Sequence, residues 1–314
     1  MAKEAKPFTK VPRYRLEKYS GKNSRHTCPS CGHKNVFSRF IDVTTGEYVA
    51  DDVGRCNREE RCGFQKSPSA ADGKEFYVTT KKVKKAYVED EITHLINPKF
   101  VVKSMGSGMD NFTSYLMKHF DHDVVRDILR RYRVGIDNLW ENSTVFWQID
   151  QNWDVRTGKI MLYDENTGKR VKQPYNHISW VHVPDKNNKF GNTHDFSLTQ
   201  CFFGEHLLNI DEITTFGVVE SEKTAILCSI ANPDSYWIAT GGVQNINEER
   251  LLPFKDKKLV FYPDKGKAFK VWEDKIAPFK GDYDVSMSNS VENSKELKEG
   301  EDIGDLVIYK FAKK

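Results

Sequence analysis

The sequence contains no apolar run close to the ~20 residues that a membrane-spanning helix requires, so we expect no membrane partner. Its first six residues, Met1-Ala2-Lys3-Glu4-Ala5-Lys6, are polar and include no apolar core of a secretion signal. The chain also lacks an ATPase motif of the Gly-x4-Gly-Lys-Ser/Thr type, a helicase segment and any internal repeat. These absences predict a cytoplasmic protein that does not hydrolyse ATP through such a motif.

Cysteine is scarce, and its distribution matters more than its number. Of the six cysteines, four lie between residues 28 and 62, whereas Cys201 and Cys228 stand alone. A chain of this length without a secretion signal is unlike the small secreted domains that depend on disulfides. Metal binding is therefore the better interpretation of the four clustered cysteines.

The length of the chain indicates more than one domain, and its charge is unevenly distributed. Its 314 residues suggest about two globular units, and 38% hydrophobic with 12% aromatic residues is enough to form cores. Residues 1–85 contain 19 Lys/Arg and 10 Asp/Glu, a balance of +9, whereas the remainder has a balance of −6. A basic front end attracts polyanions, and an acidic remainder can hold cations; a solvated surface with chance clustering is the alternative.

Two cysteine pairs supply the ligands of a predicted metal site. The first is a Cys-x2-Cys knuckle, the second has five residues between its cysteines, and 24 residues of predicted β-hairpin separate the pairs. Four thiolates so arranged close the tetrahedral site that is typical of structural Zn²⁺. The predicted ligands are Cys28, Cys31, Cys56 and Cys62.

Other residues of this cysteine module bear on the prediction as well. His26 and His33 lie close enough in sequence to replace a cysteine, but four thiolates are the preferred set. Basic side chains crowd the module and predict contacts to phosphates: Arg25, Lys34, Arg39, Arg55, Arg58 and Arg61.

The hydrophobic pattern changes from helical to β-type and then alternates between the two. Residues 111–132 have the spacing of one or two amphipathic helices, and β-type runs at 144–149 and 159–163 predict a meander. We interpret Trp147, Trp153 and Trp180 as core or sheet residues rather than nucleotide-stacking platforms. From residue 215, strands at 215–219, 236–239 and 258–262 alternate with helices at 223–230 and 268–275, which indicates a parallel sheet with helices on its faces.

Acidic residues follow two strands of this predicted sheet. Glu220 comes directly after one strand and Asp264 shortly after another. Ligands bind at the carboxyl ends of parallel strands, where carboxylates from neighbouring strands can share Mg²⁺. Asp302 and Asp305 offer further carboxylates before an apolar segment. Each acid alone could equally be a loop or cap residue, and their shared placement is what predicts the site.

These segments resemble the motifs of bacterial DNA primases. Val218-Val219-Glu220-Ser221-Glu222-Lys223-Thr224-Ala225 resembles the glutamate motif of Toprim domains, and the strand leading to Asp264 resembles their Asp-x-Asp motif. Ala239-Thr240-Gly241-Gly242 is similar to the Ala-Thr-x-Gly turn of primases, residues 145–163 to their basal subdomain, and residues 196–204 to the segment before their Toprim domain. More narrowly, the chain resembles an uncharacterised zinc-ribbon/Toprim family of bacterial mobile elements, in which Gly-Arg-Cys-Asn-Arg-Glu, here residues 54–59, is familiar.

The chain departs from the primase pattern at several metal-site positions. Gly266 replaces the second aspartate of Asp-x-Asp, Thr224 the aspartate four residues after the motif glutamate, and Ser221 the usual glycine. Gly304 stands where a late carboxylate often falls. The candidates to replace the missing ligands are Glu222, Asp274 and Asp305.

The resemblance implies an α+β and α/β multidomain chain: a basic arm and zinc ribbon (1–66), a linker (67–108), a primase-type basal subdomain (109–209) and a Toprim-like domain (210–314). It implies synthesis of RNA primers from nucleoside triphosphates on single-stranded DNA with Mg²⁺ or Mn²⁺, for a phage or mobile element, with a helicase supplied in trans. The implied catalytic residues are Glu220, Asp264, Lys159 and Arg156, with Asp302 and Asp305 as further Mg²⁺ ligands. The implied nucleic-acid contacts are Arg55, Arg58, Arg61, Lys169, Arg170 and Lys172, and Arg156 and Lys159 are also expected to contact template or nucleotide phosphates.

Two other functions remain open at this point. A non-catalytic DNA-binding or replication accessory protein on a primase scaffold is favoured by Gly266 and Thr224. A Toprim nuclease is the weaker alternative, because the chain has no ATPase motif and is too short for a topoisomerase cleavage domain.

Overall fold

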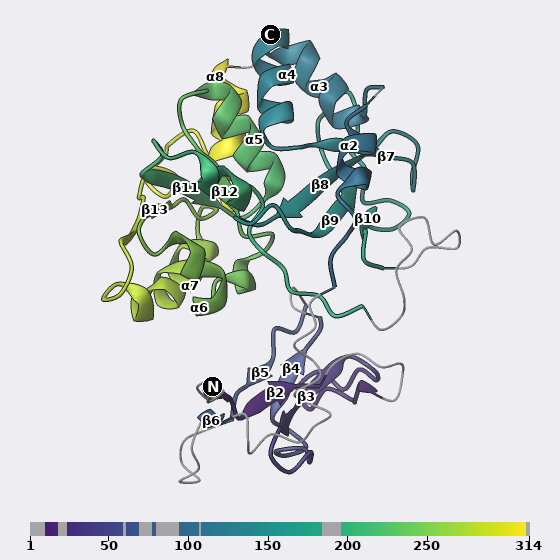
Figure 1. Cartoon of the computed structure of the whole chain (residues 1–314), viewed down its shortest axis with the longest axis vertical. Helices are drawn as coiled ribbons and strands as arrows, with labels where there is room; N and C mark the ends of the chain where they lie inside the picture. Colours follow the sequence, from purple (N-terminus) through teal and green to yellow (C-terminus); the bar gives the residue numbers. More distant parts are fainter. Residues whose placement is uncertain are drawn as a thin grey trace, which may run out of the picture. The chain divides into compact units, whose positions relative to one another are not determined.

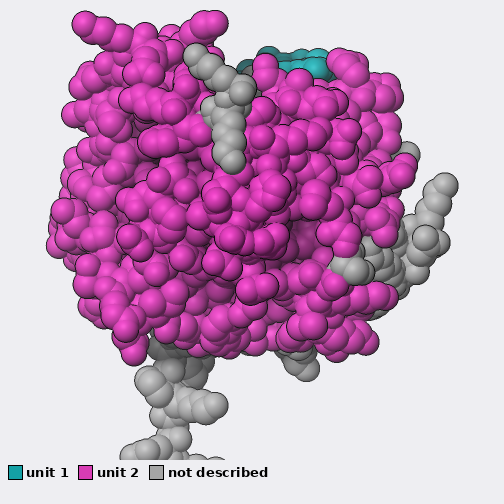
Figure 2. Space-filling view, turned by 90° about the horizontal axis from the view of Figure 1, so that it is seen from above, with its two compact units in different colours: residues 1–92 teal, residues 93–314 magenta. Residues whose placement is uncertain are grey.

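The chain folds into two compact units, residues 1–92 and residues 93–314, which Figure 2 colours separately. The computed structural model describes residues 10–17, 24–58, 61–68, 77–79, 94–106, 108–183 and 196–311. The basic cluster at 81–85 lies outside the described residues. No helix within these ranges has both the length and the apolar character needed to cross a membrane.

Unit 1 consists of short antiparallel strands. Four strands form one sheet in the order β2-β3-β4-β5, and β1 pairs with β6. Because β2 pairs with β3, part of the segment interpreted as a basic arm belongs to the ribbon sheet. The strands are β1 (Lys10–Pro12), β2 (Tyr14–Leu16), β3 (Phe37–Asp42), β4 (Gly54–Cys56), β5 (Gln65–Lys66) and β6 (Tyr77–Thr79).

The β3–β4 pair is the hairpin that was predicted between the two cysteine pairs. Its register sets Phe37 opposite Cys56, so one cysteine packs beside a fully buried ring. Gly54 on β4 lies so close to β3 that a Cβ there would come within 2.1 Å of the Ser38 carbonyl oxygen. Only glycine allows this approach.

The first half of unit 2 packs helices against an antiparallel sheet of order β10-β9-β8-β7 (Figure 1). The carboxylates of Asp110 and Asp121 accept backbone N–H bonds at the starts of α3 and α4, so each helix has an N-cap. The prediction of one or two helices within 111–132 is thus confirmed, and the number is two. The elements are α2 (Lys99–Ser104), α3 (Asn111–His119), α4 (His122–Arg131), β7 (Gly135–Asp137), β8 (Ser143–Ile149), β9 (Val155–Met161) and β10 (Ile178–Trp180).

The second half of unit 2 contains a sheet of order β12-β11-β13-β14 in which every neighbouring pair is parallel. Its strands are β11 (Thr215–Val219), β12 (Trp237–Ala239), β13 (Lys258–Phe261) and β14 (Val285–Met287). The α-helices are α5 (Glu222–Ala231), α6 (Glu248–Leu251), α7 (Lys267–Ile276) and α8 (Ile303–Phe311). The short 3₁₀ helices are η5 (Glu205–Asn209), η6 (Val243–Asn245), η7 (Leu252–Phe254) and η8 (Ala277–Phe279).

The predicted mixed architecture is confirmed: a cysteine-bearing ribbon, an antiparallel sheet, and a parallel sheet flanked by helices. Within unit 2, a single hydrophobic cluster extends from α3 and α4 through β8 to the parallel sheet. Tyr132, which has no exposed surface, joins the two halves. Its hydroxyl accepts the Trp237 N–H at 3.0 Å, donates to the Trp237 carbonyl oxygen at 2.9 Å and lies 2.8 Å from Ser229 Oγ.

Two details of the meander differ from the sequence prediction. The strand expected at 159–163 is β9, which begins four residues earlier because Gly158 lets it pass the buried Trp147; a Cβ there would lie 2.9 Å from that indole. The placement of Trp153 in the core or sheet was wrong. Trp153 occupies the β8–β9 turn with φ = 66° and is 48% exposed, because the turn directs its side chain outward.

Replacing Tyr132 by phenylalanine should lower the free energy of unfolding by about 1–3 kcal/mol, because it leaves buried backbone groups of Trp237 without their partner. Urea unfolding measures this change. Tyr309→Phe is the matched control, since that hydroxyl donates to Glu301 from an exposed position, and it should cost under about 0.5 kcal/mol. Equal losses in the two variants would contradict the joining role of Tyr132.

Candidate metal centres

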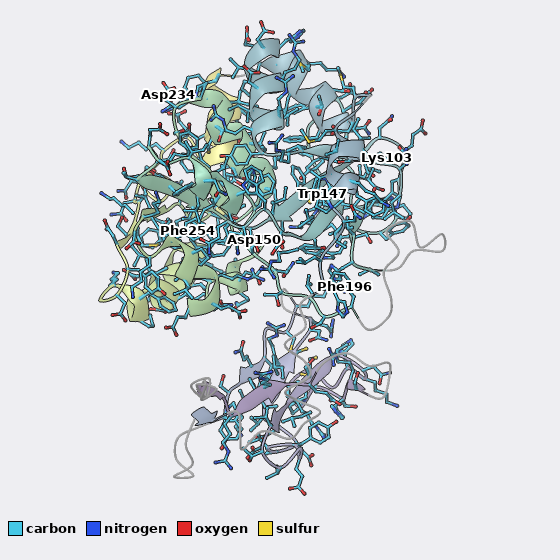
Figure 3. The ribbon with its side chains drawn as sticks, viewed as in Figure 1. Lys103, Trp147, Asp150, Phe196, Asp234 and Phe254 are labelled. Carbon is cyan, nitrogen blue, oxygen red and sulfur yellow. The ribbon has the colours of Figure 1, made fainter. Side chains whose placement is uncertain are left out.

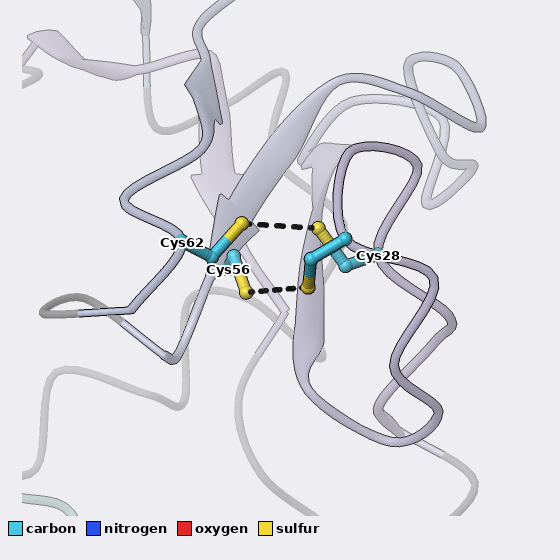
Figure 4. A group of neighbouring side chains, drawn as sticks. Cys28, Cys56 and Cys62 are labelled. Atoms are coloured by element: carbon cyan, nitrogen blue, oxygen red, sulfur yellow. Dashed lines mark hydrogen bonds between the residues drawn. The ribbon is translucent and has the colours of Figure 1, made fainter.

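The four predicted cysteines meet at one point in unit 1. All four sulfurs lie within 4.8 Å of one another, with Cys28 Sγ 3.8 Å from Cys62 Sγ and Cys31 Sγ 4.0 Å from Cys56 Sγ (Figure 4). Four sulfurs around a tetrahedral zinc ion at a Zn–S distance of about 2.3 Å lie about 3.8 Å apart. The cluster therefore has the dimensions of a closed zinc site with four cysteine ligands.

Backbone bonds and one arginine hold the two cysteine loops. In the knuckle, the Gly32 N–H donates to the Cys28 carbonyl oxygen at 2.9 Å, and in the second loop the Cys62 N–H donates to the Arg58 carbonyl oxygen at 2.8 Å. The Arg58 guanidinium lies 3.7 Å from Cys31 Sγ. Arg58, predicted to contact nucleic acid, thus has a sulfur partner within the ribbon.

The two histidines near this cluster have other partners. His26 Nε2 lies 3.1 Å from a Glu17 carboxylate oxygen, and His33 Nδ1 lies 3.1 Å from the Cys31 carbonyl oxygen. Burial raises the pKa of Cys56 to about 12, so only a bound cation would keep this thiol ionised at neutral pH. The donor set therefore fits a structural zinc ion held by the four thiolates alone.

Glu220 and Asp264 lie at one edge of the parallel sheet in unit 2. Strand β11 pairs with β13 so that Val218 is opposite Phe261, and the two acids follow these residues by two and three positions. Burial, and then the charges of Glu220, Asp302 and Asp305, raises the pKa of Asp264 to about 8. The four predicted carboxylates therefore share one electrostatic environment.

Asp302 and Asp305 also have a structural role at the start of α8. The Asp302 N–H donates to Asp305 Oδ2 at 3.1 Å, and the Asp305 N–H donates to Asp302 Oδ1 at 3.0 Å. This reciprocal arrangement is a capping box. Asp302 Oδ2 also accepts a hydrogen bond from the Thr224 hydroxyl at 2.5 Å. Thr224, which stands where the motif has an aspartate, therefore binds a neighbouring acid.

Lys223 supplies a positive charge beside these acids and was not among the predicted site residues. Its ammonium donates to the Gly168 carbonyl oxygen at 2.8 Å and experiences the charges of Asp302 and Asp305. Burial lowers the pKa of Lys223, and the charge of Lys169 contributes in the same direction. Its position within the Glu-Ser-Glu-Lys motif was the available sequence signal.

The position of the missing second aspartate is surrounded by acids from a later loop. The Gly266 N–H donates to a Glu292 carboxylate oxygen at 2.9 Å, and a Cβ on Gly266 would lie 2.8 Å from the Glu299 carboxylate. Gly266 also has φ = 93°, which strains any other residue. An aspartate at position 266 would thus be disfavoured by the backbone conformation, and it would also require the exposed Glu299 side chain to move.

The candidate replacement ligands divide into two kinds. Glu222 is buried and pairs with the Lys159 ammonium at 3.0 Å, and Asp274 forms an exposed ion pair with Lys270, also at 3.0 Å. Asp305, by contrast, belongs to the group of charges that raises the pKa of Asp264. Among the three candidates, the structure brings only Asp305 into that group.

The predicted basic contacts occupy different environments. Arg156, like Lys159, has a carboxylate partner, since its guanidinium lies 2.5 Å from the buried Asp150. Lys169 and Lys172 are exposed, and Arg170 is half-buried, on the segment after β9. In unit 1, Arg61 is exposed and Arg55 is half-buried.

The carboxylates are less tightly gathered than the thiols. Over the described ranges, the four cysteines are the only group of three or more candidate ligands whose donor atoms lie close enough to hold one ion as placed. Sharing a cation among Glu220, Asp264 and the α8 acids therefore requires rotation of their side chains.

The zinc assignment predicts about one Zn²⁺ per chain, and Cys28→Ser/Cys56→Ser should reduce the bound zinc to near zero because two of four ligands are lost. Elemental analysis of purified protein measures it. Cys228→Ala is the matched control, since that buried thiol lies on α5 in unit 2, and its zinc content should equal that of the wild type. Unchanged zinc in the double variant would sink the assignment.

Comparison with known families and structures gives the following matches. Residues 12–76 match the model of a zinc beta-ribbon finger, and residues 110–265 match a domain of unknown function (DUF6371). No curated protein matches the chain. The ribbon match and the cluster of four cysteines together support a structural zinc ion in unit 1.

The chain is similar to several solved structures, of which three are described. The primase fragment of the bacteriophage T7 primase-helicase is 10% identical, with 91% of this chain and 94% of that chain covered and a TM-score of 0.41. The DnaG catalytic core is 15% identical, with 69% and 74% covered and a TM-score of 0.42. The zinc-binding and RNA polymerase domains of Aquifex aeolicus primase are 15% identical, with 95% and 77% covered and a TM-score of 0.41. All three of these solved structures are DNA primases or fragments of them.

Proposed function

We propose that the chain is a DNA primase-like nucleotidyltransferase whose catalytic site is the acidic edge of the parallel sheet. The observation that supports this most directly is the placement of Glu220 and Asp264 after the adjacent parallel strands β11 and β13. Carboxylates at this edge suit Mg²⁺ or Mn²⁺, which bind oxygen ligands and substrate phosphates. The motif resemblance to Toprim domains points to the same two residues.

In this proposal each acid has a distinct part. Glu220 and Asp264 bind the divalent cation directly, whereas Asp302 and Asp305 hold the start of α8 beside them and complete the ligand set after side-chain rotation. Bound metal would neutralise triphosphate charge and orient an attacking 3′-hydroxyl. Lys223 balances the α8 acids while the cation is absent.

Nucleic acid is proposed to approach through basic side chains of both units. Lys169 and Lys172 are exposed on the segment after β9, and the charge of Lys169 reaches Lys223 beside the acids. In unit 1, Arg61 is exposed on the loop that carries Cys62. A basic ribbon and a basic segment near the acidic edge suit a phosphate backbone, and binding should weaken with salt.

A non-catalytic DNA-binding role on the same scaffold is the second candidate. It is favoured by Gly266, which carries no carboxylate and whose φ of 93° strains any other residue, and by Thr224, which binds Asp302 through its hydroxyl. In that case the acidic edge would bind a cation for stability and synthesise nothing.

Mg²⁺ or Mn²⁺ should raise the melting temperature of the wild type, and more strongly at pH 8.5 than at pH 6. The pKa of Asp264 in the folded protein is about 8, above its ordinary value of 3.8. The metal-free protein therefore loses stability as the pH rises between these two values, because the folded state keeps a proton that the unfolded state has already released. Protons and metal compete for this carboxylate, and metal binding stabilises by mass action. Differential scanning fluorimetry across pH measures the shift.

Glu220→Gln and Asp264→Asn should remove this metal response while preserving the fold. Asp234→Asn is the matched control, because that aspartate is exposed beyond the C-terminal end of α5, as labelled in Figure 3. Without metal at pH 8.5, Asp264→Asn should be more stable than the wild type, since it removes a buried repulsive charge. A full metal response in both site variants would rule out the acidic edge as the site.

Primer synthesis on single-stranded templates is the direct test of catalysis. The wild type should extend ribonucleotides into short products with Mg²⁺ or Mn²⁺, and Glu220→Gln or Asp264→Asn should reduce this at least about 100-fold, because charge stabilisation by a catalytic metal is worth several kcal/mol. Asp234→Asn should retain full activity. A wild type that shows the metal response but yields no primer would favour the non-catalytic candidate.

A further inference from the structure

A continuous series of flat rings runs along the edge strand β10 of unit 2. Trp180 is the last residue of β10, His182 lies in the turn that follows the strand, and both are half-buried. The ring centroids of Trp180 and His182 lie 5.8 Å apart, those of His182 and Phe196 5.8 Å, and those of Phe196 and His94 5.4 Å. We name Trp180, His182, Phe196 and His94 the ring series; Figure 3 labels Phe196.

Hydrogen bonds fix the rings in these positions. The Thr157 hydroxyl lies 2.8 Å from His182 Nδ1. The ring atom Nδ1 of His94 accepts the backbone N–H of Ser197 at 2.8 Å, and the backbone N–H of His94 donates to the Ser197 carbonyl oxygen at 3.0 Å. Burial lowers the pKa of His182 to about 4, so its ring is neutral at physiological pH. The two histidine rings of the series are therefore held in place, and rings held in this way lose little conformational entropy on binding a ligand.

One end of the ring series leads toward the acidic edge of the parallel sheet. Lys159 is directly opposite Trp180 on β9, its ammonium lies 5.8 Å from the indole centroid, and it pairs with Glu222 at the start of α5. The Glu222 carboxylate lies 3.4 Å from where a Cβ of Gly241 would be, and the Gly241 N–H donates to the Glu220 carbonyl oxygen at 2.9 Å. Lys159 and Glu222 thus connect the rings with the start of α5, two residues after the proposed catalytic Glu220.

We infer that the ring series is a stacking surface for the unpaired bases of a single-stranded nucleic acid, which it directs toward the acidic edge. This inference rests on the proposed function for its direction, whereas the rings and their contacts stand independently of it. Exposed π-faces accept any unpaired base, while bases in a duplex are already stacked on each other. Because the rings touch one another, bases would stack on their outer faces rather than between them.

The inference revises the interpretation of Trp180 as a sheet residue only. Trp153 provides a contrast, because its 48% exposed ring contacts Arg133 and the buried His206 and belongs to no such series. Trp153 is therefore a suitable control, because it is a partly exposed tryptophan of the same unit that lies outside the ring series.

The test measures binding of oligo(dT) and of a DNA duplex by fluorescence anisotropy, without added divalent cation, at several salt concentrations. Trp180→Leu and Phe196→Leu should each weaken oligo(dT) binding about 5-fold or more, the lower end of measured stacking contributions, and leave duplex binding unchanged. Trp180→Phe should bind like the wild type, as should Trp153→Leu. The log–log salt slope should stay constant, because no phosphate contact is removed.

Several results would overturn the ring series as a stacking surface. These are unchanged oligo(dT) binding in Trp180→Leu and Phe196→Leu, equal weakening in Trp153→Leu, or equal loss of duplex binding. Photo-cross-linking of a 5-bromouracil oligonucleotide, mapped by mass spectrometry on the wild type, tests the surface without any variant that could misfold. Cross-links at Trp180 or Phe196 are expected, and cross-links confined to other residues would refute the inference.

These outcomes are separate from those of the proposed function. Loss of the metal response would remove the acidic edge as a catalytic site and leave metal-free oligo(dT) binding unaffected. Failure of the ring variants to alter binding would remove the stacking surface while Glu220 and Asp264 kept their metal response.

Discussion

Repulsion between carboxylates governs the acidic half of this chain, because parallel pairing of β11 with β13 brings Glu220 and Asp264 to one edge of a sheet. The start of α8 adds Asp302 and Asp305 to the same environment, and partial burial makes each charge more costly than it would be in water. A proton on Asp264 relieves the repulsion in the metal-free protein. A divalent cation would relieve it more completely, and stability and metal binding are therefore linked through one carboxyl group.

The cysteine cluster also brings four acidic groups together, but it differs from the acidic edge in how its ligand atoms are arranged. Its four sulfurs already have the spacing of a tetrahedral zinc site, with both loops fixed by backbone bonds, so zinc enters a preformed set of ligands. In the proposed metal site, the carboxylates of the acidic edge would rotate before they share an ion, and Asp302 at present bonds to Asp305 and Thr224. A closed site suits a structural metal, whereas an adjustable one suits an ion that arrives with substrate phosphates.

Sequence reasoning succeeded where the signal was local. The continuous apolar runs that became β11, β12 and β13 predicted a parallel sheet, and cysteine spacing predicted the ligands of the cluster. It missed the role of Lys223, whose partners include Gly168, 55 residues away, and the acids Glu292 and Glu299 around Gly266. These contacts form because loops that are distant in the sequence lie beside the acidic edge in the folded chain. The spacing of residues along the sequence does not predict such contacts. The exposure of Trp153 was missed because it depends on the conformation of the β8–β9 turn, which the residue types alone do not predict.

The basic residues of the meander show why charge alone is a poor guide to nucleic-acid contacts. Arg156 and Lys159 were expected to meet phosphates, yet each pairs with a buried carboxylate, Asp150 or Glu222. A phosphate near Lys159 would gain little, because the charge of Glu222 offsets that of the ammonium and any separation would leave a buried carboxylate unpaired. In the binding surface that we infer, contacts along this strand would therefore come from groups that need no free charge. The aromatic rings would meet that requirement, and Lys159, held beside Trp180 by its ion pair, would fix the end of the ring series rather than contact the backbone of a bound strand.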